Sequence, residues 1–77
     1  MLLCHLKTIL TLVGMSQLQL AEELSISRNT ITDWIQKGAA PKLDTAYNVV
    51  DLLNTHAEMR GLEKRWTVEE VWQRRPV

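Results

Sequence analysis

Apolar residues recur at intervals of three and four positions along almost the whole chain. This spacing places them on one face of an α-helix, and no segment shows the alternation that is typical of a half-buried strand. The pattern therefore predicts an all-α fold. The expected helical stripes, in chain order, are Leu3, Leu6, Ile9, Leu10 and Val13; Leu20, Ala21 and Leu24; Ile31, Trp34 and Ile35; and Ala46, Tyr47, Val49, Val50 and Leu53.

Capping signals divide this pattern into five helices. The predicted N-caps are Ser16, Ser27, Asp44 and Thr67, and the predicted stops are Gly14, Gly38 and the residue before Gly61. Ser16 with Gln19, and Thr67 with Glu70, have the form of capping boxes. The fourth helix is expected to run through "NTHAEMR", and the fifth to be short, near residues 68–75.

The length of 77 residues predicts a single domain with a small core. We expect a core over residues 3–54 and a C-terminal extension over residues 55–77. Lys7 interrupts the apolar N-terminus, which has no cleavage site and is too short for a bilayer, so it is expected to be a core helix. Cys4 is the single cysteine, which favours a reducing, cytoplasmic location.

The formal net charge is zero, which counts against binding of nucleic acid through bulk charge alone. The charge is unevenly distributed, however. Residues 28–42 carry Arg28, Lys37 and Lys42 against Asp33 alone. The middle of the chain is therefore the locally positive part.

Two helices meet in residues 17–36 across the three-residue break Ser25-Ile26-Ser27. So short a turn requires a small residue where the helices approach, and Ala21 meets that need. If Ile31, Trp34 and Ile35 face inward, the outward face of the second helix carries polar groups. These are Asn29, Asp33 and Gln36, with Thr32 at the edge and Arg28 at the leading end.

The stretch "GMSQLQLAEELSISRNTITDW" resembles the helix-turn-helix of the lambda-repressor-like (Cro/repressor, XRE-type) family of bacterial and phage transcriptional regulators. The following "WIQKGAAPKLDTAYNVVDLL" is similar to the pattern of that family as well, so that the resemblance covers roughly residues 3–54. The first turn position is usually Gly, because it takes a left-handed backbone, and here it is Ser25. The resemblance implies a five-helix, sequence-specific regulator of transcription, expected to be a repressor, whose third helix enters the major groove of duplex DNA.

Arginine suits the two acceptors of guanine, asparagine suits adenine, and a carboxylate can accept from cytosine. We therefore expect base contacts from Arg28, Asn29, Thr32 and Asp33. The resemblance implies a phosphate contact from Gln17. Further expected phosphate contacts are Ser27, which is also needed as a cap, and Gln36, Lys37 and Lys42.

The C-terminal extension carries a large apolar load in Trp66, Val68, Val71 and Trp72. Two interpretations stay open and are compatible. In the first, these side chains cover the chain's own core; in the second, they form the interface of a two-fold homodimer.

No catalytic constellation, metal-ligand spacing or cofactor motif is present, so we expect no enzyme, no metal, no cofactor and no small-molecule ligand. The expected partner is a pseudo-palindromic operator bound by a homodimer. The alternative is a protein-interaction module, such as an antitoxin or adaptor, that uses the same fold.

Overall fold

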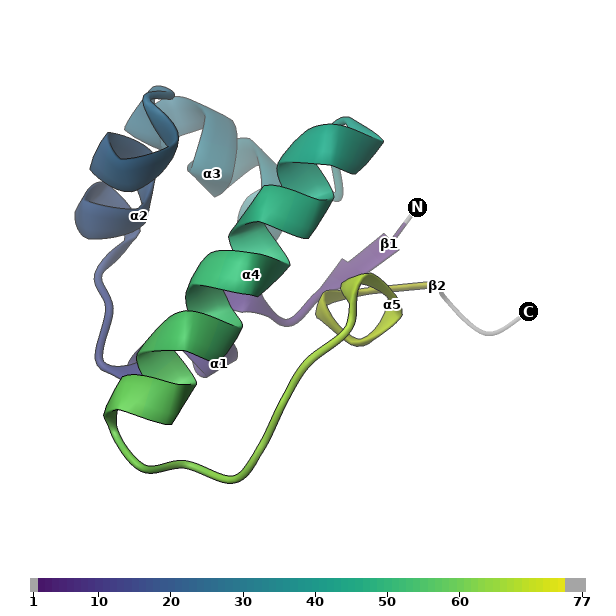
Figure 1. Cartoon of the computed structure of the whole chain (residues 1–77). Helices are drawn as coiled ribbons and strands as arrows, with labels where there is room; N and C mark the ends of the chain where they lie inside the picture. The colour runs from purple at the N-terminus through teal and green to yellow at the C-terminus, as the bar shows by residue number, and fades with distance from the viewer. Residues whose placement is uncertain (1, 75–77) are drawn as a thin grey trace.

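The computed structural model describes residues 2–74, and within them the chain forms five helices and two short strands (Figure 1). In chain order these are β1 (Leu2–Cys4), α1 (Leu6–Val13), α2 (Gln17–Leu24), α3 (Arg28–Gln36), α4 (Leu43–Met59), α5 (Val68–Val71) and β2 (Trp72–Arg74). The five predicted helices are confirmed, and the strand pair is a minor addition to the helical fold. None of the helices in this part of the chain is long and apolar enough to cross a membrane.

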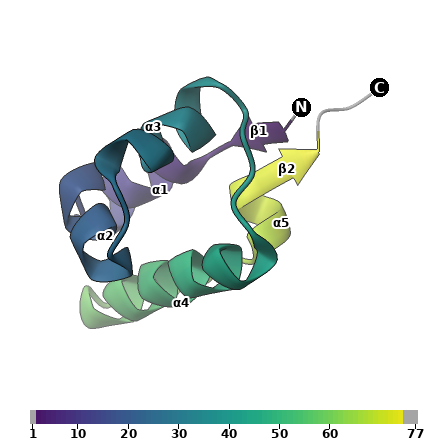
Figure 2. The same ribbon diagram turned by 90° about the horizontal axis from the view of Figure 1, so that it is seen from above.

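One hydrophobic cluster joins all five helices and β2. α4 runs along one side of the molecule, with α1, α2 and α3 on the other side (Figure 2). The fully buried side chains that fill the space between them are Leu6, Val13, Leu20, Ile31, Val49, Leu53 and Val71. Because both the helix-turn-helix segment and the C-terminal extension contribute to this cluster, they share one core.

The start of the chain differs from the prediction. Leu3 was expected on the stripe of the first helix but lies in β1, opposite Gln73 of β2. The pairing is antiparallel and extends to His5, whose backbone N–H donates to the carbonyl of Val71 at 2.8 Å. The helix therefore begins at Leu6. Helical spacing within a local window carries no information about a partner strand so distant in sequence, and the prediction that no strand forms was wrong.

α1 ends as predicted, at Gly14, whose φ of 73° is left-handed. The Gly14 N–H bonds to the Thr11 carbonyl at 3.3 Å. The guanidinium of Arg60 lies over the Gly14 backbone, where a Cβ would collide with it. Gly14 is thus favoured by its left-handed backbone conformation, whereas the flexible end of the exposed Arg60 side chain can move aside for a Cβ.

α4 begins two residues earlier than predicted. Lys42, in an extended conformation, is the N-cap residue, and Asp44 lies in the first turn without acting as the cap. Its carboxylate still favours this end of the helix through the helix dipole. The buried face is also rotated from the predicted stripe, because Tyr47 is 56% exposed whereas Ala46 and Val49 are buried. The end of α4 at Met59, before Gly61, is as predicted.

α5 is shorter than predicted. Thr67 and Glu70 form the complete capping box, but the helix ends at Val71 instead of near residue 75. Trp72 leaves the helix with φ −116° and ψ 84° and begins β2. Pairing with β1 therefore replaces further helical turns. Residue 75 itself lies outside the described part of the chain.

Candidate nucleic-acid interface

The corner between α2 and α3 positions the candidate interface. Ser25 has φ 57° and ψ 41°, the left-handed conformation expected for this turn position. The two amides after α2 close its last turn, since Ser25 N–H donates to Glu22 at 3.2 Å and Ile26 N–H donates to Ala21 at 3.0 Å. The turn is therefore hydrogen-bonded to the helix that precedes it.

Close packing holds this corner rigid. Ala21 is 2% exposed, which confirms that a small residue lies where the helices meet. Ile26, in the turn, is half-buried and packs against the core. Ile31 and Trp34 of α3 are buried, and Ile35 packs against the cluster. The inward face of α3 is thus the predicted one, and its other side is left for solvent or a ligand.

Two serines cap the helices of the corner as predicted. Ser16 Oγ accepts from the Gln19 amide at 3.0 Å. Ser27 Oγ accepts from the Thr30 amide at 3.3 Å and lies 2.9 Å from the Thr30 hydroxyl. Because the Ser27 hydroxyl is engaged in capping, a contact from Ser27 to phosphate has to be shared with that role.

The outward face of α3 carries the expected polar groups. Arg28, Asn29 and Gln36 are exposed, and Thr32 and Asp33 are partly exposed. Thr32 Oγ1 donates to the Arg28 carbonyl at 3.2 Å, so its methyl group and hydroxyl have a fixed orientation.

Asp33 lies 3.4 Å from Lys37 Nζ, one turn along the helix, which offsets the one acidic charge on this face. The Lys37 side chain is largely exposed and the Asp33 side chain about half exposed, so the pair is weak and can exchange for other partners. The helix thus presents Arg28 as a cation at its start. Lys37 is a second cation at its end and is paired with Asp33.

The remaining candidates flank α3. Gln17 is the first residue of α2, immediately after its Ser16 cap, and is half-buried. Lys37 lies at the end of α3, and Lys42 at the start of α4; both are exposed. Helix N-termini favour anions through their unpaired amides and the helix dipole. Gln17 and Ser27 are both placed at such ends.

The large apolar residues of the C-terminal extension face the core. Trp66, Val71 and Trp72 are at most 7% exposed, and Val68 is half-buried against the same cluster. The first interpretation of these residues, a cover for the chain's own core, is confirmed. A homodimer stays a prediction, and Trp66, Val71 and Trp72 offer little surface to it.

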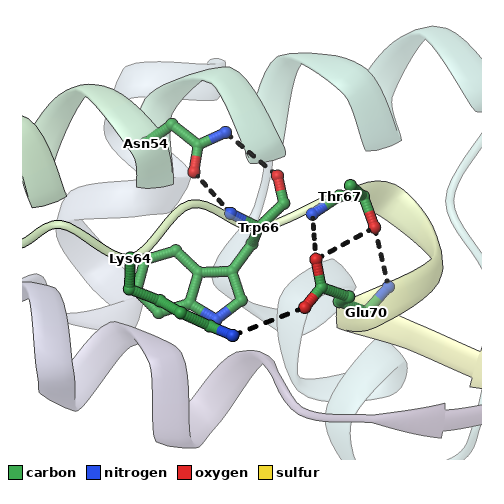
Figure 3. Close-up of polar contacts among 5 residues, drawn as sticks. All are labelled: Asn54, Lys64, Trp66, Thr67 and Glu70. Atoms are coloured by element: carbon green, nitrogen blue, oxygen red, sulfur yellow. Dashed lines mark hydrogen bonds and ion pairs between the residues drawn. The ribbon is translucent and has the colours of Figure 1, made fainter.

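Sequence reasoning missed the residue that attaches this extension to α4. Asn54 donates from Nδ2 to the Trp66 carbonyl at 3.0 Å and accepts at Oδ1 from the Trp66 amide at 2.8 Å (Figure 3). The side-chain amide thus pairs with a backbone peptide as a neighbouring strand would. Lys64 adds an ion pair to Glu70 at 3.6 Å. No sequence signal distinguishes Asn54 from other polar residues of α4.

The titratable residues form no second site. Within residues 2–74 no three His, Cys, Asp or Glu side chains gather as a metal site would require. Burial raises the pKa of the Cys4 thiol, an effect that a hydrogen bond from the Leu6 backbone partly offsets. His5 bonds to the Gln73 side chain at 2.9 Å, and His56 lies 3.4 Å from Glu23, joining α4 to α2.

Comparison with models of protein families gives a match over most of the chain. A family model described as Helix-turn-helix matches residues 6–59, which span α1 to α4 and include the corner at Ser25. No curated protein and no solved structure matches the chain. The match begins after β1 and ends before α5 and β2, so these three elements lie outside the matched region.

Proposed function

Because the chain belongs to the Helix-turn-helix family of lambda-repressor-like DNA-binding regulators, we propose that it binds specific sites on duplex DNA as a repressor of transcription. The observation that carries the proposal is the exposed leading end of α3. Ser27 caps this helix, a buried corner holds it, and Arg28 and Asn29 emerge first from it. The family is one of regulatory DNA-binding domains, which are not typically enzymes.

In this proposal α3 lies in the major groove. Arg28 donates to the two acceptors of a guanine, and Asn29 pairs with an adenine. Thr32, whose hydroxyl is turned back to the helix, offers its methyl group to thymine. Asp33 accepts from a cytosine N4, or excludes wrong positions by repelling phosphate.

Phosphate contacts hold the protein on the duplex in this arrangement. Gln17 and Ser27 act at the N-termini of α2 and α3, where backbone amides add donors. Gln36, Lys37 and Lys42 reach the backbone at the other end of α3. Contacts of this kind set affinity and orientation, whereas base contacts set the choice of sequence.

A single module reads few base pairs, so we propose a homodimer on a pseudo-palindromic operator. The half-sites would lie about 34 Å, one helical turn, apart. We further propose that regulation comes from protein concentration, a protein partner or turnover. The operators of bacterial and phage regulators lie in the cytoplasm, and we propose the same location for this chain.

Titration of random duplex DNA over a series of salt concentrations tests the proposal. The logarithm of Kd should rise linearly with the logarithm of the salt concentration, and the few cations of the interface should set the slope. Selection of bound sequences from a random pool should then yield a repeated half-site. If low salt gives no binding at any protein concentration, DNA is not the ligand, and the alternative of an antitoxin or adaptor that binds protein gains support from the zero net charge.

A further inference from the structure

An open groove of about 500 Å³ lies between the first half of α4 and α5, which pack against each other. The side chains that line it are Tyr47, Val50 and Asp51 of α4, Trp66 and Thr67 of the segment before α5, and Val68 and Glu69 of α5. Val50 and Trp66 are buried, whereas Tyr47 is exposed. The groove therefore has an apolar floor and, on its α4 wall, an aromatic side chain that is open to solvent.

The exposed apolar surface continues along α4 beyond the groove. Leu43 and Tyr47 are 65% and 56% exposed, and they lie one turn apart on the same side of the helix. Single apolar residues scattered over a surface need no explanation, whereas neighbouring ones beside a groove indicate an interaction site. This side of α4 thus has the composition of a contact surface.

Hydrogen bonds hold the floor of the groove in place. Both backbone groups of Trp66 bond to the side-chain amide of Asn54, at 2.8 and 3.0 Å (Figure 3). Thr67, the next residue, is fixed by its capping box with Glu70. Binding to a site that is already ordered loses less conformational freedom than binding to a mobile one. The groove is therefore ready to receive a ligand without rearrangement of its floor.

The groove is acidic. Asp51 and Glu69 line it, and Asp44 lies on α4 three residues before Tyr47. All three carboxylates are exposed, and none belongs to an ion pair within residues 2–74. Among the described residues that line the groove there is no lysine, arginine or histidine. The negative charge of the groove is thus available to a cation of a ligand.

A larger groove, between α1 and the C-terminal extension, differs in charge. It measures about 910 Å³, and Arg74 lines it together with Glu69 and Glu70. Glu70 is already paired with Lys64. Because cation and acids lie in the same groove, the charges of the larger groove favour no particular ligand. The acidic groove between α4 and α5 is the one whose chemistry indicates an occupant.

We propose that the groove between α4 and α5 binds a basic segment of another protein, through an arginine that is flanked by apolar residues. The guanidinium lies on the ring of Tyr47 and donates to the carboxylates of Asp51 and Glu69. A flanking apolar side chain fills the groove over Val50 and Val68. Arginine suits this site better than lysine, because its planar group stacks on aromatic rings and pairs with carboxylates through two hydrogen bonds.

Charge argues against other occupants of the groove. The carboxylates of Asp51 and Glu69 repel the phosphates of DNA and of an anionic lipid surface. A second copy bound about a two-fold axis at this groove would place the same carboxylates opposite each other, which is unfavourable. A basic partner is therefore the occupant that the groove complements.

The position of the groove makes this proposal independent of the proposed function. α4 lies on the side of the molecule opposite α3, the candidate recognition helix (Figure 2). A partner on α4 and α5 therefore leaves α3 open to DNA. Binding of the partner and binding of DNA can then be measured separately on the full chain.

Selection from a library of random short peptides, displayed on phage, tests the proposal. The immobilised full chain should enrich peptides in which an arginine stands beside apolar residues. A synthetic copy of an enriched peptide should bind less tightly when lysine replaces its arginine, and should not bind when glutamate does. A selection that yields no binder, or binders without a basic residue, would overturn the proposal.

Variants of the groove test its residues with the same synthetic peptide. The double variant Asp51→Asn with Glu69→Gln should raise the Kd at least ~5-fold through the loss of both carboxylates. Tyr47→Ala should raise it about 3- to 10-fold, whereas Tyr47→Phe keeps the ring and should bind nearly as the parent does. Glu22→Gln removes an exposed carboxylate of α2 outside the groove and is the matched control.

All these side chains are exposed, so the variants should fold, and thermal unfolding checks that they do. A double variant that binds the peptide as tightly as Glu22→Gln would overturn the proposal.

Amide chemical shifts locate the bound peptide. It should shift the amides of Tyr47, Asp51 and Val68 and leave those of α3 unchanged, and shifts confined to α3 or to the larger groove would overturn the proposal. Arg28→Ala should not change peptide binding. A chain that binds the peptide but no duplex defeats only the proposed function, and a chain that binds duplex but selects no arginine-bearing peptide defeats only this proposal.

Discussion

The indole rings of Trp34 and Trp72 meet edge to face, with centroids 5.8 Å apart and an angle of 83° between their planes. Trp34 belongs to α3, inside the matched family region, and Trp72 to β2, outside it. Both are buried. The candidate recognition helix is therefore supported from behind by a residue of the C-terminal extension.

Removal of this support should destabilise the fold. Trp72→Ala leaves a large cavity behind α3, and we expect the free energy of unfolding to fall by about 3–5 kcal/mol. Trp72→Phe keeps an aromatic ring, and it loses no hydrogen bond because the Trp72 Nε1 has no partner among the described residues. Its cost should be nearer ~1–2 kcal/mol. Urea unfolding followed by circular dichroism measures both, and equal costs would contradict the packing role.

Glycine at position 25 should stabilise the protein. Ser25 has a left-handed backbone, which costs a residue with a Cβ about 1 kcal/mol. Ser25→Gly removes that strain at the price of greater freedom in the unfolded chain, so we expect a net gain of roughly 0.5 kcal/mol in thermal unfolding. Ser27→Ala, two residues on, should instead cost about 1 kcal/mol through the lost cap. A destabilised Ser25→Gly would show that the Ser25 side chain has a role of its own.

The amide of Asn54 should be needed to hold the extension. Asn54→Ala leaves both backbone groups of Trp66 without their partners, in a half-buried place, and should cost about 1–3 kcal/mol. Asn54→Asp keeps the acceptor for the Trp66 amide but turns a carboxylate oxygen towards the Trp66 carbonyl at neutral pH, so it should destabilise as well. Thr55→Ala, an exposed neighbour on α4, serves as the control. An Asn54→Ala variant as stable as this control would rule out the attachment.

Arg28 and Lys37 should affect DNA binding differently. Arg28→Ala should lose roughly 1–3 kcal/mol on the selected site and relax the choice of sequence. Lys37→Ala should weaken all sequences alike and reduce the salt slope by about one unit.

Titrations of selected and random duplexes compare the two variants, with Lys7→Ala, an exposed lysine of α1, as the control. Because Lys37 also pairs with Asp33, Lys37→Ala leaves an uncompensated acid on the face of α3. The double variant with Asp33→Asn should therefore recover part of the loss. Identical effects of Arg28→Ala and Lys37→Ala would contradict the separate roles.

Local signals predicted most of the helix-turn-helix region. The caps at Ser16 and Ser27, and at Thr67 outside this region, follow from interactions within a few residues of each other and are confirmed. The left-handed backbone at Ser25, which the family resemblance implied, and the burial of the small Ala21 are also found. The polar face of α3 is where helical spacing places it. Contacts from this face to DNA stay predictions.

Features that depend on distant parts of the chain were beyond local reasoning. The spacing of Leu3 fits a helix, but pairing with Gln73 makes it part of a strand. Tyr47 fits the apolar stripe of α4 but is exposed, whereas Ala46 and Val49 are buried in the core. The double hydrogen bond of Asn54 requires knowledge of where Trp66 lies.

The pairing of β1 with β2 has a consequence for the order of synthesis. β1 leaves the ribosome before every other element described, and its partner β2 leaves after all of them. Until then Trp34 has no indole to pack against, and the edge of β1 is bare. Closing so long a loop is entropically costly, and contacts at large sequence separation form late in folding. A nascent chain that stops at the end of α4 therefore contains the whole helix-turn-helix sequence. Its recognition helix should nevertheless lack the packing that fixes its position.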